Sequence, residues 1–238
     1  MTEKKNTTVV LVHGAFADAA SWTGVIDQLQ QAGVTVTAVA NPLRGLTPDA
    51  AYVAAVVRQI DGPVLLVGHS YGGAVINAAA RGLGNVVGLV HVAAFVPDTG
   101  ESLASISAGF PNTPFGAAVR PTMFPQPDGT EAPEVHLDPA AYPDVFAGDL
   151  PIEVSRVLAV AQRPIAVQGL EEKFSGEPAW KALPTWTLVA TEDNAIHPDA
   201  QRFMAERAGG TTIEVAGSHS VAVSQPKAVA DLVLKALS

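Results

Sequence analysis

The sequence contains 238 residues, of which 48% are hydrophobic and 16% are charged, a composition typical of a folded globular protein. No apolar run approaches the ~20 residues of a membrane-spanning helix, and the net charge of -9 disfavours binding to nucleic acid or to anionic membranes. The chain has no cysteine, which excludes disulfides and thiolate chemistry. We expect a cytoplasmic protein without nucleic-acid or membrane partners, and a homodimer is one alternative for its assembly.

Strand-like and helix-like segments alternate along the chain. The first apolar run, residues 9–12, is shorter than the core of a signal peptide (~7–15 residues) and is assigned to a strand. Strands are expected at residues 7–12, 34–40, 64–67, 86–95, 185–190 and 211–216. Helices are expected at residues 22–32, 48–60, 72–81, 140–146, 151–162 and 198–208 and after about residue 224. The alternation predicts an α/β fold in which a mostly parallel six-stranded sheet is flanked by helices.

The long segment between the fourth and fifth expected strands differs from the rest of the chain. Residues 98–180 contain twelve acidic and four basic residues, a net charge of -8, whereas the remaining chain has eleven acidic and ten basic residues. Prolines are concentrated in the same stretch. We therefore predict a core of residues 1–96 and 183–238 and a cap insertion of residues 97–182. Ligands of open α/β sheets bind at the carboxyl ends of the strands, and the cap is expected to lie over these ends.

One short stretch surrounds a serine with glycines where a strand becomes a helix: Gly68-His69-Ser70-Tyr71-Gly72. In that setting the G-x-S-x-G pattern is typical of a nucleophile elbow, a turn so tight that side chains at both outer glycines would collide with neighbouring backbone. The turn exposes the Ser70 hydroxyl above the sheet, and the N-terminus of the next helix favours negative charge there. The alternative is a glycine-rich turn with an incidental serine.

A serine hydroxyl becomes a strong nucleophile only when a base takes its proton and an acid orients that base. Three histidines follow Ser70 at a plausible distance. His136 lies in the insertion and His197 begins a helix, whereas His219 lies on the loop after the last expected strand. We predict His219 as the base, and a surface-loop histidine is the alternative.

The acid is expected between the serine and the histidine in chain order. Asp193 lies on the loop after the strand at residues 185–190, and we predict it as the acid, with Glu192 as a rival on the same loop. Asp98 is a second rival because it lies just past the fourth strand. A simpler interpretation of Asp98 is that it is the first charged residue of the acidic insertion and has no catalytic role.

The oxyanion of a tetrahedral intermediate needs two N–H donors. One is expected to be the amide of Tyr71, next to the nucleophile. The other is expected from the loop after the first strand, where the amide of Ala15 is predicted and that of Phe16 is the alternative. His13 precedes the serine, and we expect it to brace this loop by hydrogen bonding rather than to act as a base.

Motifs for cofactors and metals are missing from the sequence. The glycines of residues 82–88 precede a strand, whereas a dinucleotide-binding loop follows one. There is no phosphate-binding loop, no H-E-x-x-H motif and no cluster of carboxylates. We expect neither a cofactor nor a metal.

Four stretches, LVHGAFADAASW, GHSYGGAV, ATEDNAIHP and GSHSV, together resemble the α/β-hydrolase superfamily. The chain is similar to the compact branch that contains plant methylesterases, hydroxynitrile lyases and many bacterial esterases. The resemblance covers nearly the whole chain and implies the α/β-hydrolase fold. It also implies Ser70 as nucleophile, His219 as base, Asp193 as orienting acid, and Ala15 and Tyr71 as the oxyanion hole.

The sequence departs from the related lyases at two positions. Those lyases usually have threonine after the first-loop histidine and lysine after the catalytic histidine, where this chain has Gly14 and Ser220. This departure favours ester hydrolysis, and Ser70 disfavours the superfamily activities that use an aspartate nucleophile.

We therefore expect a serine carboxylic ester hydrolase that forms an acyl-enzyme with small, neutral, moderately apolar esters. The alternatives are lactone hydrolysis, lyase chemistry or perhydrolysis at the same residues, or a ligand receptor with slow turnover. Apolar side chains of the insertion are candidates for the substrate pocket, although most are expected to serve packing. They are Phe110, Phe115, Met123, Phe124, Tyr142, Phe146, Leu158, Phe174 and Trp180.

Overall fold

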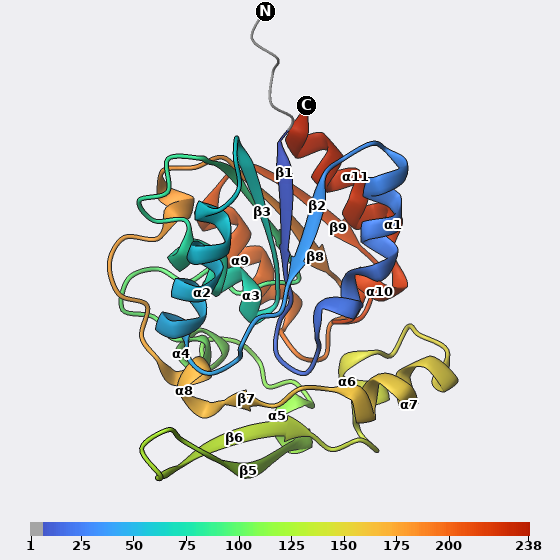
Figure 1. Cartoon of the computed structure of the whole chain (residues 1–238). Coiled ribbons are helices and arrows are strands. Elements are labelled where there is room, and N and C mark those ends of the chain that lie inside the picture. Colours follow the sequence, from blue (N-terminus) through green and yellow to red (C-terminus); the bar gives the residue numbers. More distant parts are fainter. Residues whose placement is uncertain (1–6) are drawn as a thin grey trace, which may run out of the picture.

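Six parallel strands form the central sheet of the protein, which we describe from a computed structural model over residues 7–238 (Figure 1). The sheet order is β2-β1-β3-β4-β8-β9. The strands are β1 (Thr8–Val12), β2 (Val36–Val39), β3 (Val64–His69), β4 (Val86–Val92), β8 (Thr185–Ala190) and β9 (Thr211–Val215). The predicted α/β architecture with a six-stranded sheet is confirmed. Residues 1–6, which belong to the predicted core, lie outside the described residues.

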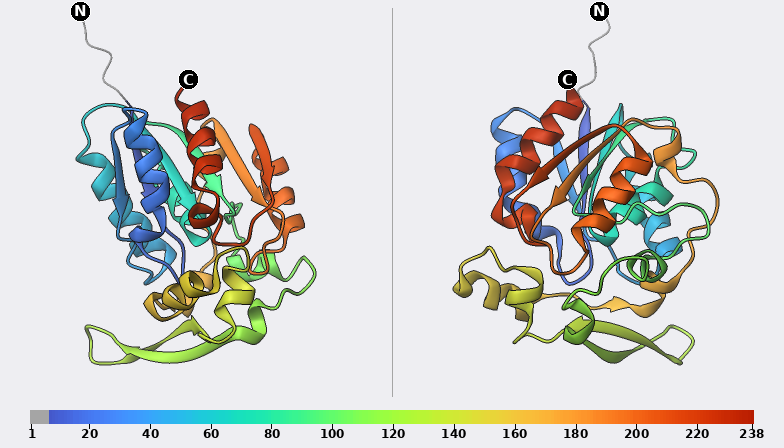
Figure 2. Two further views of the ribbon diagram at one scale, coloured as in Figure 1. Left: turned by 90° about the vertical axis from the view of Figure 1, so that its right-hand side faces the viewer. Right: turned by 180° about the vertical axis from the view of Figure 1, so that it is seen from behind.

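The two faces of the sheet carry separate apolar cores because successive side chains of a strand point to opposite sides. On β1, Val9 and Leu11 belong to one core, and Val10 and Val12 belong to the other. The first core is closed by η1 (Ala19–Trp22), α1 (Thr23–Gln31), α10 (Val221–Ser224) and α11 (Pro226–Leu237). The second is closed by α2 (Leu46–Arg58), α3 (Tyr71–Ala79) and α9 (Pro198–Ala208) (Figures 1 and 2).

Between β4 and β8 the chain forms a further layer below the carboxyl ends of the strands (Figures 1 and 2). Its strands β5 (Val119–Pro125), β6 (Glu131–Leu137) and β7 (Ile165–Ala166) form an antiparallel sheet. Its helices are α4 (Leu103–Ser107), α5 (Phe115–Ala118), α6 (Tyr142–Phe146), α7 (Ile152–Ala161) and α8 (Val167–Glu171). A short turn, η2 (Ala179–Lys181), leads to β8. We refer to residues 97–182 as the cap, and the division of the chain at these boundaries stays a prediction.

The antiparallel sheet of the cap was not predicted from the sequence, whereas α6 and α7 were. Asp128 and Gly129 form the tip of the β5–β6 hairpin, where Gly129 takes a φ of 84°. This Asp-Gly pair is a common hairpin signal. However, β5 contains Pro121 and Pro125, which argue against a strand, and its side chains are mostly exposed rather than alternating. In the core, β4 ends at Val92 instead of residue 95 because Ala93 turns the chain with a φ of 42°.

Candidate active site

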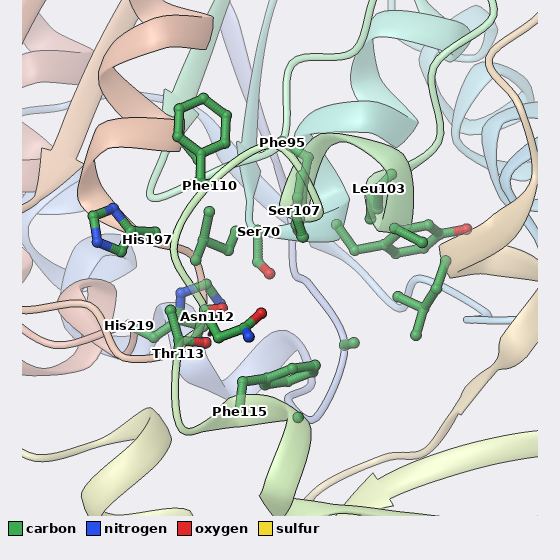
Figure 3. Close-up of a pocket in the computed structure, with 18 of the residues that line it drawn as sticks. Ser70, Phe95, Leu103, Ser107, Phe110, Asn112, Thr113, Phe115, His197 and His219 are labelled. Carbon is green, nitrogen blue, oxygen red and sulfur yellow. Dashed lines mark hydrogen bonds between the residues drawn. The ribbon is translucent and has the colours of Figure 1, made fainter.

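Ser70 lies at the sharp turn between β3 and α3. Its φ of 54° and ψ of -124° fall in a region that costs a residue with a side chain about 1–3 kcal/mol. The Ser70 carbonyl accepts hydrogen bonds from the amides of Gly73 (3.0 Å) and Phe95 (3.1 Å), and its own amide donates to the carbonyl of Val92 (3.2 Å). These contacts hold the strained turn, and Ser70 lines a cavity at this edge of the sheet (Figure 3).

Three glycines let the surrounding backbone approach this turn. A Cβ on Gly68 would lie 2.5 Å from the carbonyl oxygen of Gly72, and a Cβ on Gly72 would lie 2.3 Å from that of Val12. A Cβ on Gly14 would lie 2.6 Å from the Cβ of Ser70. Contacts this short are forbidden by hard-sphere repulsion. The prediction that side chains at Gly68 and Gly72 would collide with backbone is confirmed.

The side chains of His219 and Asp193 are buried and hydrogen-bonded to each other. His219 Nδ1 lies 2.7 Å from Asp193 Oδ2, and Gln201 Nε2 donates to the same oxygen at 2.7 Å. Asp193 Oδ1 accepts from the amides of Ala195 (2.7 Å) and Ile196 (2.9 Å). Because a carboxylate oxygen accepts hydrogen bonds, its contact with Nδ1 places the proton of the imidazole on that nitrogen. The other ring nitrogen, Nε2, is therefore left as a potential base.

Ser70 and His219 line the same cavity, as Figure 3 shows. Within residues 7–238, no hydrogen bond joins the Ser70 hydroxyl to the His219 ring. Such bonds are often long in sites without substrate and shorten in the reacting complex. The structure thus brings Asp193 against His219, and His219 and Ser70 to one cavity wall.

His69, which sequence reasoning did not single out, holds the backbone of the His219 loop. Its Nε2 donates to the carbonyl oxygen of His219 at 2.8 Å, and the two rings lie 4.8 Å apart. Burial, reinforced by the neighbouring His219, lowers the pKa of His69 to about 3. His69 therefore stays neutral at ordinary pH and acts as a hydrogen-bond donor. Its position inside the G-x-S-x-G motif was the available signal.

His13 braces the first loop, as predicted. Its Nδ1 lies 2.8 Å from the carbonyl oxygen of Gly14, and its Nε2 accepts from the amide of Asn41 at 3.0 Å. The Asn41 side-chain amide donates a hydrogen bond of 3.0 Å to the His13 carbonyl oxygen. Burial lowers the pKa of His13 to about 4, which keeps one ring nitrogen available as an acceptor.

Two residues that line the Ser70 cavity, Ala15 and Tyr71, have backbone amides that could act as oxyanion donors. Neither Ala15 N nor Tyr71 N has an acceptor among the residues that the structure describes. The amide of Phe16, the alternative considered from the sequence, donates instead to the carbonyl of Arg163 in the cap at 3.1 Å. The Tyr71 hydroxyl donates to buried Asp49 at 2.8 Å, so that side chain is committed to the core.

The cavity at Ser70 has a volume of about 560 Å³ and mainly apolar walls. No Lys, Arg, Asp or Glu occurs among its described lining residues. Its polar side chains besides Ser70 and His219 include His197 of the core and Ser107, Asn112 and Thr113 of the cap, all labelled in Figure 3. The site is therefore suited to a mostly apolar, uncharged molecule.

Comparison with known proteins identifies the family. The sequence profile of the alpha/beta hydrolase family matches residues 9–232. The chain belongs to the alpha/beta hydrolase family. No match to a curated protein sequence was found.

Several solved structures of hydrolases share this fold. Polyneuridine aldehyde esterase superposes with a TM-score of 0.83 at 22% identity, over 98% of this chain and 100% of that one. An extracellular alpha/beta-hydrolase from a Paenibacillus species, described as sharing structural and functional homology with Tobacco Salicylic Acid Binding Protein 2, gives 0.78 at 24% identity, over 97% and 98%. The methylesterase MES16 from Arabidopsis gives 0.78 at 19% identity, over 97% and 98%. The predicted resemblance to α/β hydrolases and plant methylesterases is confirmed.

The rival candidates for acid and base do not contact the Asp193–His219 pair among the described residues, although His197 lines the Ser70 cavity. Asp98 pairs with Lys181 at 2.7 Å, and this partner lowers the pKa of the Asp98 carboxyl below its ordinary value. Glu192 is exposed, and neither acid contacts His219 among the described residues. His136 lies on β6 of the cap. His197 lines the cavity, but its Nδ1 accepts from the amide of Asp199 at 3.2 Å and caps the N-terminus of α9.

Only three of the nine apolar cap residues proposed for the pocket line this cavity, namely Phe110, Phe115 and Phe146. The others serve packing or lie at the surface, as expected for most of them. Phe124 lies under the Arg44 guanidinium at 4.3 Å, and Met123 is 54% exposed. The remaining four are Tyr142 and Leu158, which line a second cavity, and Phe174 and Trp180, which are buried in the core of the hydrolase.

No group of three or more His, Asp or Glu side chains that could hold a metal ion is found in the described part of the chain. Over the same residues, no helix is both long enough and apolar enough to span a bilayer.

Proposed function

We propose that this alpha/beta hydrolase is a serine carboxylic ester hydrolase that works through an acyl-enzyme. The observation that carries the proposal is the buried 2.7 Å contact between His219 Nδ1 and Asp193 Oδ2, with His219 and the strained Ser70 on one cavity wall. Two structural neighbours, polyneuridine aldehyde esterase and the methylesterase MES16, are named as esterases, which supports this reaction class.

In the proposed reaction, Ser70 Oγ attacks the ester carbonyl carbon while His219 Nε2 takes its proton. Asp193 stabilises the imidazolium that forms and keeps the ring oriented. When the tetrahedral intermediate collapses, the bond to the alcohol oxygen breaks and His219 returns the proton to that oxygen. The acyl group stays on Ser70 until water, deprotonated by His219, attacks the acyl carbon. The bond to Ser70 Oγ then breaks, His219 returns the proton to Oγ, and the acid is released.

The developing oxyanion would be stabilised by the amides of Ala15 and Tyr71. Both amides lack an acceptor among the described residues, so they need no rearrangement to bind negative charge. Tyr71 also begins α3, whose N-terminal dipole favours an anion there. Preorganised donors of this kind typically contribute about 10²–10³-fold each to the rate.

The cavity favours small, neutral, moderately apolar esters. A carboxylate on the substrate would lose its hydration among apolar walls that offer no Lys or Arg among the described lining residues. The net charge of -8 over residues 98–180 adds a weak repulsion on approach.

Lactone hydrolysis and perhydrolysis at the same residues are the nearest alternatives, because both also proceed through an acyl-enzyme. A lyase mechanism that relies on threonine after the first-loop histidine is disfavoured. A Cβ at Gly14 would come within 2.6 Å of Ser70 Cβ and 3.1 Å of Ser70 Oγ. A slow-turnover receptor is disfavoured because a receptor has no use for a buried Asp193–His219 pair whose histidine lines the same cavity as Ser70.

The test is covalent labelling with a fluorophosphonate together with hydrolysis of a panel of p-nitrophenyl esters and lactones. We expect the label on Ser70, and we expect Ser70→Ala to lose both labelling and ester hydrolysis. Ser107→Ala, which changes another hydroxyl on the same cavity, should keep both. Labelling at another residue, or hydrolysis by Ser70→Ala within tenfold of wild type, would overturn the proposal. Tight ligand binding with negligible turnover, unchanged by Ser70→Ala, would identify a receptor instead.

A further inference from the structure

A second, smaller cavity lies beside the one at Ser70 and has a volume of about 150 Å³. Its walls come from η1, α6, α7 and α10 and are mostly apolar. They include Ala17, Ala20, Tyr142, Leu158, Ala161 and Val223. The proposed reaction makes no use of this space.

Phe16 and Phe146 line both cavities and form the wall between them. Their rings meet edge to face, with centroids 6.1 Å apart and an interplanar angle of 88°. Both residues are buried, at 3% and 2% exposure. The two spaces are therefore separated by a single layer of aromatic rings.

The wall is held by hydrogen bonds to its backbone. The Tyr142 hydroxyl donates to the Phe16 carbonyl at 3.3 Å, and the Phe16 amide donates to the Arg163 carbonyl at 3.1 Å. The Phe146 carbonyl accepts from the amide of Ser220 at 2.9 Å. Since both phenylalanines are anchored through the main chain, shortening either side chain leaves these hydrogen bonds available.

The wall lies on the leaving-group side of the proposed reaction. The Phe146 ring packs edge to face on the His219 ring, with centroids 4.6 Å apart. Because His219 must return its proton to the leaving alcohol, the alcohol part of the ester lies next to His219 and thus towards Phe146. The acyl part, on the other side of the carbonyl carbon, points away from the wall.

We propose that Phe16 and Phe146 set the longest alcohol group that the enzyme accepts, and that the second cavity is an extension of the alcohol subsite from which these two rings separate it. This inference rests on the proposed ester hydrolase function. Removing one ring joins the two cavities and makes apolar space available to a longer alkyl group. Each further methylene that enters is worth about fourfold in kcat/KM.

The test measures kcat/KM for a series of butyrate esters from methyl to octyl, by pH-stat, in wild type, Phe146→Ala and Phe16→Ala. The quantity compared is the ratio of the octyl to the ethyl ester, because any damage to His219 or to the oxyanion hole lowers both esters alike. We expect this ratio to rise at least tenfold in either variant. The p-nitrophenyl acyl series from acetate to octanoate should keep its chain-length profile.

Two further variants make the result specific. Phe115→Ala, which lines only the cavity at Ser70, enlarges that cavity without breaching the wall and should leave the octyl-to-ethyl ratio within threefold of wild type. Leu158→Trp, which refills the second cavity, should cancel the gain when it is combined with Phe146→Ala.

The inference is overturned if the ratio stays at the wild-type value in both wall variants, or if only the acyl series changes. Fluorophosphonate labelling of the same samples separates this failure from failure of the proposed function. If the enzyme is labelled at Ser70 and hydrolyses short esters but its preference for alcohol chain length does not shift, only the proposed role of Phe16 and Phe146 is refuted. Enzyme that is not labelled at Ser70 refutes the hydrolase proposal itself.

Discussion

The core and the cap of this alpha/beta hydrolase contribute to the site in different ways. The core brings together the groups of the proposed reaction, because Ser70, Asp193 and His219 follow β3, β8 and β9, whose carboxyl ends lie at one edge of the sheet. The cap supplies most of the apolar walls and holds two core loops by its main chain. The carboxyl ends of the parallel strands therefore position the side chains of the proposed reaction, while the cap shapes the cavity that a substrate would enter.

The first prediction separates the two candidate acids, Asp193 of the core and Asp98 of the cap. Asp193→Asn should lower kcat by about 10⁴-fold, because an amide cannot stabilise the imidazolium and favours the wrong tautomer of His219. Asp98→Asn breaks only the pair with Lys181, which is 29–34% exposed, and should change kcat less than twofold. Single-turnover and steady-state kinetics with a p-nitrophenyl ester measure both. Equal losses in the two variants would contradict the assignment.

The second prediction compares a glycine of the core with one of the cap. Gly72→Ala forces a Cβ to within 2.3 Å of the Val12 carbonyl oxygen, whereas Gly116→Ala meets nothing within 4 Å. We expect Gly72→Ala to lower the free energy of unfolding by about 3 kcal/mol or more and Gly116→Ala to change it by less than about 0.5 kcal/mol. Urea unfolding followed by circular dichroism measures the difference. A Gly72→Ala protein as stable as wild type would show that the elbow can relax.

The third prediction concerns three buried histidines of the core. Burial lowers the pKa of His13 to about 4 and those of His69 and His91 to about 3. The unfolded chain takes up protons near pH 6.5, whereas these folded side chains stay neutral until pH 4 or below. Stability should therefore fall as the pH drops from about 6.5 towards 4, by up to about 1.4 kcal/mol per pH unit for each histidine.

Denaturant unfolding at several pH values tests the slope. His91→Gln should lower it by about one third, since one of the three histidines is removed. Val90→Ala, the buried neighbour on β4, should lower stability by a similar amount at every pH and leave the slope unchanged. A slope that is the same in His91→Gln and wild type would mean that other groups govern the acid response.

The fourth and smallest prediction concerns the tie between the cap and the first loop. Arg163 Nη1 donates to the Asn41 carbonyl at 2.8 Å, while the Arg163 carbonyl accepts from the Phe16 amide. Arg163→Gln should lower kcat about tenfold with little change in KM, because the loop that carries Ala15 becomes less well positioned. Arg156→Gln, an exposed change on α7, should leave both constants unchanged. A rise in KM with an unchanged kcat would instead indicate that Arg163 contacts the substrate.

The same contrast explains which features could be predicted from the sequence. The core strands are continuously apolar and alternate with amphipathic helices, so β8 and α9 have the bounds predicted for them. That Ser70, Asp193 and His219 lie at one end of the sheet could be predicted because the loops that follow the strands of a parallel sheet meet at one edge, and their catalytic roles stay a prediction. Neither the bounds of β8 and α9 nor the position of these three residues depends on the structure of the cap.

The cap follows weaker local rules. Strand β5 carries prolines and exposed side chains, and α4, α5 and α8 have only five or four residues each, too short for a helical period to be read. The packing of Phe146 on His219 joins residues far apart in the chain, and no local pattern encodes such a contact. The role of His69 was missed for the same reason, because its partner is a backbone carbonyl 150 positions away.

The attachment of α6 to the histidine loop has a practical consequence for engineering. The Ser218 hydroxyl donates to Asp149 and its oxygen lies 3.3 Å from the Phe146 carbonyl oxygen, which accepts from the Ser220 amide. Grafting the cap of another hydrolase onto this scaffold would need to retain residues 142–149 or rebuild all three contacts. The β5–β6 hairpin has no comparable bond to that loop within the described residues and is the natural site for inserting or exchanging sequence.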